Sequence, residues 1–289
     1  MKKGFLKTLK PYFYLTPTFL ILGIILIYPI IKVFIDSFYR FFGDKRIPVG
    51  LGNYKFLFLE DNTIYKSIFN NLKMLTVVPI LLILALVISF VMFNQIKNYK
   101  IYQFIFFLPV ILSVAVVGVV FRYLLRSDGL INTIFQSLHL NFLSQNWLGN
   151  PKISIFALIG VIVWKELGFG IVLFMARLLS LDKSLFEAAR IDGANSFTIL
   201  FRVVIPQIKS LMAFYVLYNV IIVFSWTFGY VYTMTKGGPS LSTITLEYQI
   251  YHGLTTKNLP GIASAVAVVL FVIVFVFIFL QSKVRMADE

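Results

Sequence analysis

Residues 187–206 read EAARIDGANSFTILFRVVIP and form a polar, charged stretch between two long apolar segments. Ser184 is followed three residues later by Glu187, a pair that fits a capping box and predicts a helix start. Gly193 stands where a glycine commonly ends a helix. A helix of about two turns, at about 1.5 Å per residue, is too short to cross a bilayer. This first helix is therefore expected to lie at a membrane surface.

A second helix is expected soon after Gly193. Asn195 or Ser196 can cap its first turn. Apolar residues then recur at helical spacing until Pro206, which is expected to interrupt the helix because proline lacks a backbone N–H. The two helices together predict an exposed elbow, which we define as residues 177–210.

The elbow resembles the EAA loop of the integral-membrane subunits of binding-protein-dependent ABC importers. The family pattern is EAA, three residues, a glycine, nine residues and then Ile-x-Leu-Pro. Val203 and Ile205 replace the usual Ile and Leu, which are conservative departures on an apolar face. The positions that match in type and spacing are Glu187, Ala188, Ala189, Gly193 and Pro206.

Other segments extend the resemblance over nearly the whole chain, from about Tyr14 to Val284. The fuller form EAA-x-IDGA, at residues 187–194, is similar to the carbohydrate branch of the family, such as maltose and glycerol-phosphate permeases. Residues 235–239, TKGGP, resemble the Thr-x-Gly-Gly-Pro segment that follows the fifth span. Residues 51–54, LGNY, resemble the Asn-Tyr element of the first outer loop.

The resemblance implies a permease subunit of an ATP-driven carbohydrate importer, which forms half of the translocation pore. The implied partners are a second homologous permease, a cytoplasmic ATPase dimer, an extracytoplasmic solute-binding protein and the carbohydrate itself. Asp192 joins the matched positions Glu187, Ala188, Ala189, Gly193 and Pro206 as candidates for coupling to the ATPase. Gly237, Gly238 and Pro239 are candidates for contact with the binding protein.

Composition favours a membrane protein independently of the family. The chain is 59% hydrophobic and 13% charged, whereas about a quarter of the residues of soluble domains are charged. A net charge of +14 could indicate a nucleic-acid partner, but the basic residues are scattered among short loops. Anionic lipid head groups are the expected counter-charge. The absence of cysteine excludes disulfides and thiol chemistry.

Six apolar segments are long enough to cross a hydrocarbon core of about 30 Å, where closed backbone hydrogen bonding requires helices. The expected fold is therefore an all-α polytopic membrane protein with six transmembrane helices, a single importer transmembrane domain over residues 1–289. Pro109 lies inside the third span and can kink it. The expected spans are 16–36, 72–93, 102–122, 154–176, 211–233 and 261–281.

Basic residues predict the orientation of these spans in the cytoplasmic membrane. They are most concentrated before the first span and in the elbow, so both segments are expected on the cytoplasmic side. Six spans then place the N- and C-termini inside, and the elbow becomes a cytoplasmic helix-turn-helix coupling loop. The residues concerned are Lys2, Lys3, Lys7, Lys10, Arg177, Lys183, Arg190, Arg202 and Lys209.

The sequence carries no G-x-x-x-x-G-K-[S/T] phosphate-binding motif, so ATP and Mg are expected on the partner ATPase and no cofactor on this chain. It also carries no H-E-x-x-H motif. His139 and His252 stand alone in loops. We therefore expect no catalytic residues and no metal site.

Polar residues interrupt the apolar fifth span. Asn219, Trp226 and Tyr230 are separated by seven and four residues, which predicts a shared helix face. Aromatic surfaces with a few amides and hydroxyls suit sugars, although helix packing and an interfacial aromatic belt are alternatives. The candidate substrate-path residues are Asn219, Trp226, Tyr218 and Ser225, with Trp164 and Phe169 added by the resemblance.

Two questions remain open from the sequence. Lys165 and Glu166 are ionisable residues inside the fourth span, where they fit either a place beside the translocation path or a neutralised structural pair. The function also has an alternative, a self-sufficient secondary transporter or channel for a small polar solute. The elbow favours the importer, because a secondary transporter has no need for a cytoplasmic docking helix.

Overall fold

The computed structural model describes residues 14–43 and 45–286. Contacts divide the chain into two compact units. The first comprises Met1–Ile64 and Gln249–Val272, and the second comprises Tyr65–Tyr248 and Ile273–Glu289. Three helices contribute to both units: α4 (Thr63–Met74), α13 (Leu246–Thr255) and α14 (Pro260–Met286). Each unit is described by itself below.

The first unit opens with a helix over Tyr14–Asp36, which includes the π-helical η1 (Gly23–Ile27) and α2 (Tyr28–Asp36). A short antiparallel hairpin follows, formed by β1 (Tyr39–Phe42) and β2 (Lys45–Pro48), with Tyr39 opposite Pro48. The all-α expectation did not include this hairpin. The unit continues with α3 (Gly52–Lys55) and η2 (Phe56–Glu60).

Asn53, in the LGNY segment, connects α3 to the end of α2 and to strand β1. Its side chain is fully buried, and its Nδ2 donates to the carbonyl oxygens of Ser37 (2.8 Å) and Tyr39 (2.9 Å). Gly261, in α14, also packs on this strand, because a Cβ added there would overlap the Tyr39 carbonyl oxygen. Asn53 therefore satisfies backbone groups that would otherwise be buried without a partner.

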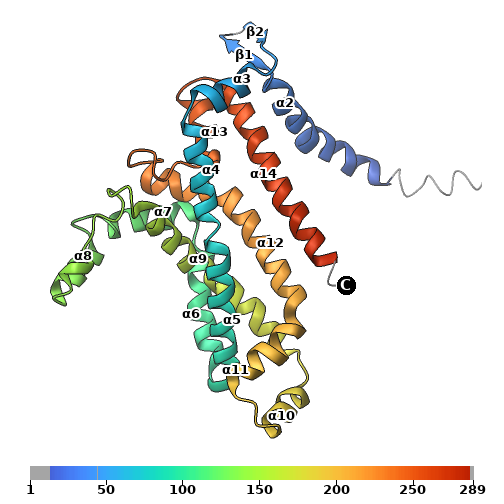
Figure 1. Ribbon diagram of the computed structural model, residues 1–289, viewed down its shortest axis with the longest axis vertical. Helices are drawn as coiled ribbons and strands as arrows, with labels where there is room; N and C mark the ends of the chain where they lie inside the picture. Colours follow the sequence, from blue (N-terminus) through green and yellow to red (C-terminus); the bar gives the residue numbers. More distant parts are fainter. Residues whose placement is uncertain (1–13, 44, 287–289) are drawn as a thin grey trace, which may run out of the picture. The chain divides into compact units, whose positions relative to one another are not determined.

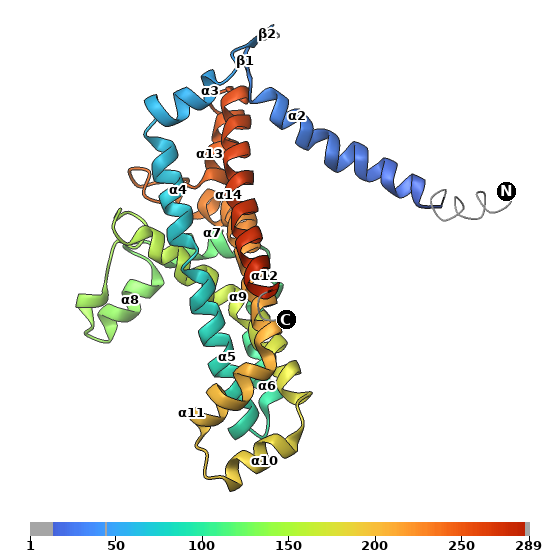
Figure 2. The same ribbon diagram turned by 45° about the vertical axis from the view of Figure 1, so that its right-hand side comes forward.

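The second unit is almost entirely helical (Figures 1 and 2). Besides parts of α4, α13 and α14, its elements are α5 (Val77–Gln95), α6 (Tyr99–Ile111), α7 (Val114–Leu124), α8 (Leu130–Ser137), η3 (Asn141–Leu143), α9 (Ser154–Leu179), α10 (Lys183–Ile191), α11 (Ser196–Thr198), η4 (Ile199–Val204), α12 (Ile205–Tyr230) and η5 (Val231–Thr235). Helix α9 packs against both α5 and α6, and α12 packs against α5 and α7. The elbow and the α8 segment project from this packed group in both views.

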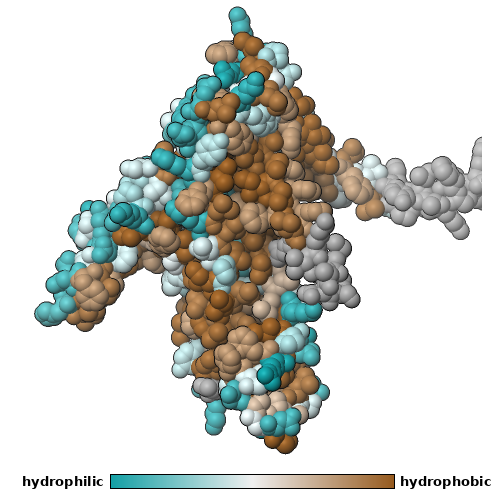
Figure 3. Space-filling view, in the orientation of Figure 1, coloured by the Kyte–Doolittle hydropathy of each residue, from teal (hydrophilic) through white to brown (hydrophobic). Residues whose placement is uncertain are grey.

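The helices confirm the polytopic membrane fold. In the described part of the chain, five helices are long and apolar enough to cross a bilayer, and a bent pair provides a sixth candidate. Hydrophobic residues cover the helices of the second unit, whereas hydrophilic residues gather around α10 and along the α8 segment (Figure 3). The five helices are Tyr14–Asp36, Thr63–Asn94, Ser154–Leu179, Ser196–Thr235 and Pro260–Leu280.

The structure differs from the simplest interpretation of two spans. The third segment, in which Pro109 was expected to allow a kink, is broken into α6 and α7, which meet at an angle of 95°. The fifth helix does not start near residue 211, and Pro206 does not end a separate helix, since the chain is helical from Ser196 to Thr235. A wider π-helical stretch, η4, precedes Pro206, which lies in the first turn of α12. Local π-helical widening of this kind is one way in which a helix accommodates a proline, which lacks a backbone N–H.

Candidate functional site

Helix α10 carries the EAA residues, and its start differs from the expected one. Asp182, rather than Ser184, is the N-cap, and its carboxylate accepts a hydrogen bond from the Ser184 N–H at 2.9 Å. This bond and one from the Ser184 side chain hold the pKa of Asp182 below its ordinary value. The capping-box prediction for Ser184 was therefore wrong by two positions, because Asp182 occupies the cap.

Gly193 ends α10 as predicted. Its φ is +80°, and the Ala194 N–H reaches back to the Ala189 carbonyl at 2.9 Å, which is the bonding pattern of a Schellman turn. A Cβ at Gly193 would meet no atom within 4 Å. Glycine is thus required here for its left-handed backbone and not for space.

One face of α10 packs on the end of α5. Phe186 is buried, and its ring centroid lies 5.1 Å from that of Phe93. One turn later, Arg190 donates to the Asn94 Oδ1 at 3.2 Å. The other face is open: Glu187, Ala188, Asp192 and Gly193 are exposed, Ala189 is partly buried, and the Ile191 side chain is 87% exposed.

A hydrogen bond also joins the two ends of the elbow. Arg177, at the end of α9, donates to the carbonyl oxygen of Gln207 at 3.1 Å, which joins the two helices that flank the elbow. Asn195 caps the second helix, as predicted, by accepting from the Thr198 N–H at 2.8 Å. Pro206 is exposed just before Gln207. The elbow is thus fastened to both α9 and α12.

An aromatic cluster lies between α9 and α12. The rings of Phe169 and Tyr218 are 4.7 Å apart, and Phe214 lies 6.4 Å from Tyr218. Tyr215 packs edge-on against Phe174 at 5.2 Å. The structure therefore brings two of the candidate substrate-path residues, Phe169 and Tyr218, into contact, and it adds Phe214, which the sequence did not single out.

The remaining substrate-path candidates lie apart from one another. Asn219 is 1% exposed, and its Nδ2 donates to the Tyr215 carbonyl of the same helix at 2.8 Å. Trp226 is 53% exposed and Ser225 is exposed beside it. Trp164 packs on Phe121 at 5.0 Å. Asn219, Trp226 and Tyr230 all lie on the continuous helix α12, as their spacing predicts, but Asn219 and Tyr230 are buried whereas Trp226 is open.

Lys165 and Glu166 form a buried ion pair within α9, with 3.0 Å between the Lys165 Nζ and the Glu166 Oε1. The two residues are 3% and 6% exposed. In the described part of the chain, the buried hydroxyls of Tyr215 and Tyr230 have no hydrogen-bond partner. Groups of this kind normally pair with water or a ligand. This ion pair and these two hydroxyl groups thus lie among the apolar side chains that pack α9 against α12.

The segment after the fifth helix, residues 235–248, which we call the Gly237 loop, is fixed to α4 by two consecutive asparagines. The Asn70 Nδ2 donates to the carbonyl oxygens of Leu241 (3.1 Å) and Ile244 (2.9 Å). The Asn71 Oδ1 accepts from the Leu246 N–H at 2.9 Å. No sequence pattern singles out this pair, because its partners are more than 170 residues away.

Within this loop, Gly237 is buried with φ +79°, and Gly238 and Pro239 are partly buried. Lys236 and Ser240 flank them and are exposed. A partner that docks on the loop would therefore meet Lys236 and Ser240 more fully than Gly237. The glycines thus determine the backbone path of the loop, and Lys236 and Ser240 form its exposed surface.

Glu247 lies near the end of the same loop and is partly buried. The Asn71 Nδ2 donates to its Oε1 and Oε2, at 3.0 and 3.2 Å. Burial of this carboxyl raises its pKa to about 7. The orientation of the Asn71 amide is unambiguous, because its oxygen accepts from a backbone N–H and its nitrogen must therefore face Glu247.

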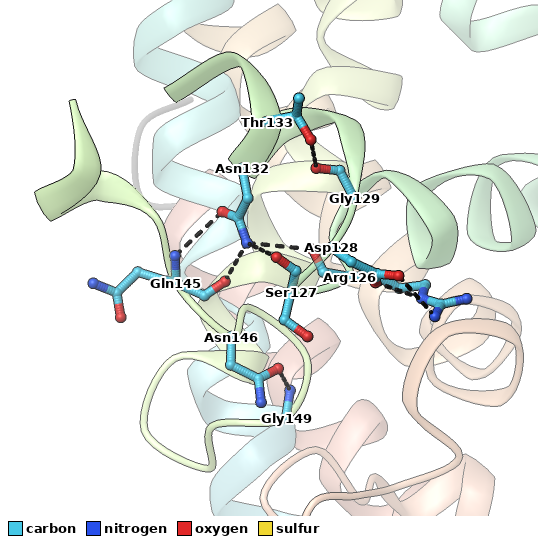
Figure 4. A network of polar contacts seen from close by, with 9 residues as sticks. All are labelled: Arg126, Ser127, Asp128, Gly129, Asn132, Thr133, Gln145, Asn146 and Gly149. Atoms are coloured by element: carbon cyan, nitrogen blue, oxygen red, sulfur yellow. Dashed lines mark hydrogen bonds and ion pairs between the residues drawn. The ribbon is translucent and has the colours of Figure 1, made fainter. Parts of the chain in front are cut away.

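The connection from α7 to α9 is held together by Asn132 of α8 (Figure 4). Its buried side chain donates to the carbonyl oxygens of Ser127 (3.1 Å) and Gln145 (2.8 Å) and accepts from the indole N–H of Trp147 (2.9 Å). These hydrogen bonds join the two ends of the segment.

Among the described residues, no group of three His, Cys, Asp or Glu side chains could hold a metal ion.

Residues 63–285 match the model of the family described as "Binding-protein-dependent transport system inner membrane component". The chain belongs to this family. It is therefore the membrane-embedded permease subunit of an ABC importer, a multi-pass protein distinct from the subunit that hydrolyses ATP. This assignment does not support the alternative of a self-sufficient secondary transporter or channel.

Individual relatives agree with the family. The chain is 33% identical to the osmoprotective compounds uptake permease protein GgtC of Synechocystis over 265 residues, which are 89% of this chain and 92% of GgtC. It is 29% identical to the arabinooligosaccharides transport system permease protein AraP of Bacillus subtilis, over 91% and 84% of the two chains. Its fold matches a chain of a bacterial alginate ABC transporter, solved with a periplasmic protein that carries an alginate pentasaccharide. The TM-score is 0.80, with 21% identity over 95% and 94% of the chains.

Proposed function

We propose that this permease carries a carbohydrate, that α10 couples it to a cytoplasmic ATPase dimer, and that an extracytoplasmic solute-binding protein delivers the substrate. A second, homologous permease completes the pore, ATP and Mg bind to the ATPase, and residues 1–289 act as one transmembrane domain. Both termini lie in the cytoplasm.

The arrangement of α10 supports this proposal most strongly. Phe186 and Arg190 attach one face of the helix to α5, and Arg177 ties the base of the elbow to α12. The opposite face exposes Glu187, Ala188 and Ile191. Small and apolar side chains allow close approach of a partner, and the carboxylate can pair with its basic groups. A displacement of α10 would therefore pass to the transmembrane helices.

The position of the Gly237 loop supports an extracytoplasmic location for it. The elbow contains the start of the long helix Ser196–Thr235, and the Gly237 loop begins at its end. If this helix spans the bilayer, the elbow and the loop lie on opposite sides. Basic residues in the elbow favour its cytoplasmic location. The Gly237 loop is then extracytoplasmic, where Lys236 and Ser240 are available to the binding protein.

The aromatic surfaces support a carbohydrate substrate. Phe169, Tyr218 and Phe214 combine ring faces with a phenol hydroxyl, a combination suited to the C–H faces and hydroxyls of a sugar. Trp226 presents a further open ring on α12. AraP is named for arabinooligosaccharides, and the alginate transporter was solved with a pentasaccharide, so an oligosaccharide is the first substrate class to test.

Reconstitution tests this function. The chain is co-purified with the second permease and the ATPase, placed in liposomes, and supplied with the solute-binding protein and labelled oligosaccharides. Uptake should require ATP and every component. Uptake by this chain alone, driven by an ion gradient, would contradict the proposal, and uptake of only non-carbohydrate osmolytes would contradict the substrate class.

A further inference from the structure

The break in the third span leaves backbone groups that need partners inside a membrane protein. A continuous helix would bond the Val110 carbonyl to the Val114 N–H, but the chain turns by 95° between α6 and α7. At the start of α7, Ser113 acts as the N-cap and accepts from the Val116 N–H at 3.3 Å. Where water is scarce, the freed carbonyls of α6 need donors as well.

Lys165 supplies a donor for one of them. Its Nζ lies 3.4 Å from the Val110 carbonyl oxygen and 3.0 Å from the Glu166 Oε1. A positive charge at the carboxyl end of a helix is also favoured by the helix dipole. In a straight third span, the Val110 carbonyl would already accept a hydrogen bond within its own helix, so the break is what makes this carbonyl depend on the Lys165 donor. The ammonium group therefore favours the bent over the straight form.

The two arms of the break make their tightest contacts with different helices, although Phe121 of α7 also packs on Trp164 of α9. A Cβ at Gly168 of α9 would overlap the Phe106 carbonyl oxygen, so α6 and α9 are in backbone contact. A Cβ at Gly118 of α7 would overlap the side chain of Thr233, and one at Gly229 of α12 would lie 2.7 Å from Val114. Helix α6 is therefore held closest to α9, and α7 closest to α12.

We propose that Lys165 is a positioning residue that holds the third span broken between Ile111 and Val114, and that Glu166, by pairing with its ammonium group, keeps that group directed at the break. The angle between α6 and α7 then sets the angle between the α9 and α12 pairs, which flank the elbow. This inference rests on the described contacts alone and does not depend on the identity of the substrate.

The competing interpretation, a merely neutralised buried pair, makes a different prediction for a charge swap. The double variant Lys165→Glu with Glu166→Lys keeps two opposite buried charges. It moves the ammonium group by one residue, about 100° around the helix, and so away from Val110. A neutral pair, Lys165→Met with Glu166→Gln, removes the donor without burying an unpaired charge. Lys165→Arg retains a cationic donor and serves as the conservative control.

The experiment measures the distance between spin labels on the two arms in the purified full chain. Tyr102→Cys and Tyr123→Cys provide the labelling sites, because both side chains are exposed and the chain has no cysteine. At about 1.5 Å per residue, the backbone positions are about 22 Å apart with the bend and about 32 Å apart in a straight helix. The wild type and Lys165→Arg should give the short distance.

The charge swap and the neutral pair should shift the distribution toward the long distance or broaden it over both. A single short distance in the neutral pair would overturn the proposal, whatever the swap shows, because packing alone would then maintain the break. If the swap fails to insert, the neutral pair still decides. Transport is not measured here, so a failure of the importer assignment would leave this result unaffected.

Discussion

Phe186 of α10 packs against Phe93 near the end of α5, with 5.1 Å between the ring centroids. This contact joins the exposed EAA helix to the helix group of the second unit. Among the described side chains of α10, only Phe186 is buried. The contact is therefore the main apolar anchor of α10, and the mechanical role that we propose for this helix depends on it.

Phe186→Ala should uncouple ATP hydrolysis from transport. Removing a buried phenylalanine ring costs about 3–5 kcal/mol in a packed core, enough to loosen α10 from α5. We expect the importer to assemble but to lose most of the substrate stimulation of its ATPase. Phe156→Ala, which removes an exposed ring from α9, is the matched control. Equal stimulation in both variants would show that the contact transmits no force.

Gly193 should tolerate substitutions according to backbone conformation rather than size. Its φ of +80° and the open space around it predict that Gly193→Asn retains coupling, because asparagine accepts left-handed geometry. Gly193→Val should lose coupling, with a strain of about 1–3 kcal/mol at the end of α10. The measurement is ATP-driven uptake in membranes with matched protein levels. A functional valine variant together with an inactive asparagine variant would reverse this reasoning.

Replacing Trp226 by alanine and replacing Asn219 by alanine should have different effects on substrate affinity and on stability. Trp226 is open and Asn219 is buried with its amide bonded within α12, so Trp226→Ala should weaken apparent substrate affinity while leaving thermal stability unchanged. Asn219→Ala should lower stability by about 1 kcal/mol, the net value of a typical hydrogen bond, with a smaller effect on affinity. Uptake titrations and thermal unfolding in detergent separate the two effects. A destabilised Trp226 variant with normal affinity would assign that ring to helix packing.

The Gly237 loop should be more tightly held in acid than in base. The pKa of the Glu247 carboxyl is raised to about 7, so the folded loop binds this proton more strongly than the unfolded chain does. The resulting stabilisation is complete below the ordinary value of 4.5 and is lost as the pH rises through about 7. Hydrogen exchange of residues 236–248, corrected for intrinsic rates, should therefore show greater protection at pH 5.5 than at pH 8.

Glu247→Gln provides the control for that pH dependence. The amide can still accept from Asn71 but has no proton to lose near neutrality, so protection of the loop should become independent of pH. The same slope in the wild type and the variant would assign the effect to another group.

The sequence predicted local features more successfully than contacts between distant residues. Gly193 and Asn195 act at their own positions, and the structure confirms the helix end and the cap that were expected from them. Asp182 replaced Ser184 as the N-cap because both residue types can cap and lie only two positions apart. Pro109 indicated a possible kink, but Ser113, the cap that allows a complete break, is a single hydroxyl in an apolar run.

The contacts that organise the candidate site could not be inferred from one chain without coordinates. Asn70 and Asn71 look like ordinary polar residues before an apolar span, since their partners lie in the Gly237 loop. Lys165 and Glu166 stood out as ionisable residues, but the Val110 carbonyl became a partner only because the third span is broken. Helical spacing placed Trp226 near Asn219, yet neighbouring helices cover only one of them.

The most direct test of the account is side-specific cross-linking of the assembled importer through two single cysteines. Ala188→Cys lies on the open face of α10, and Ser240→Cys lies on the exposed edge of the Gly237 loop. We predict that Ala188→Cys is labelled from the cytoplasm and cross-links to the ATPase, whereas Ser240→Cys is labelled from outside and cross-links to the solute-binding protein. Labelling of Ala188→Cys only from outside, or its cross-linking to the binding protein, would contradict both the topology and the coupling role of the elbow.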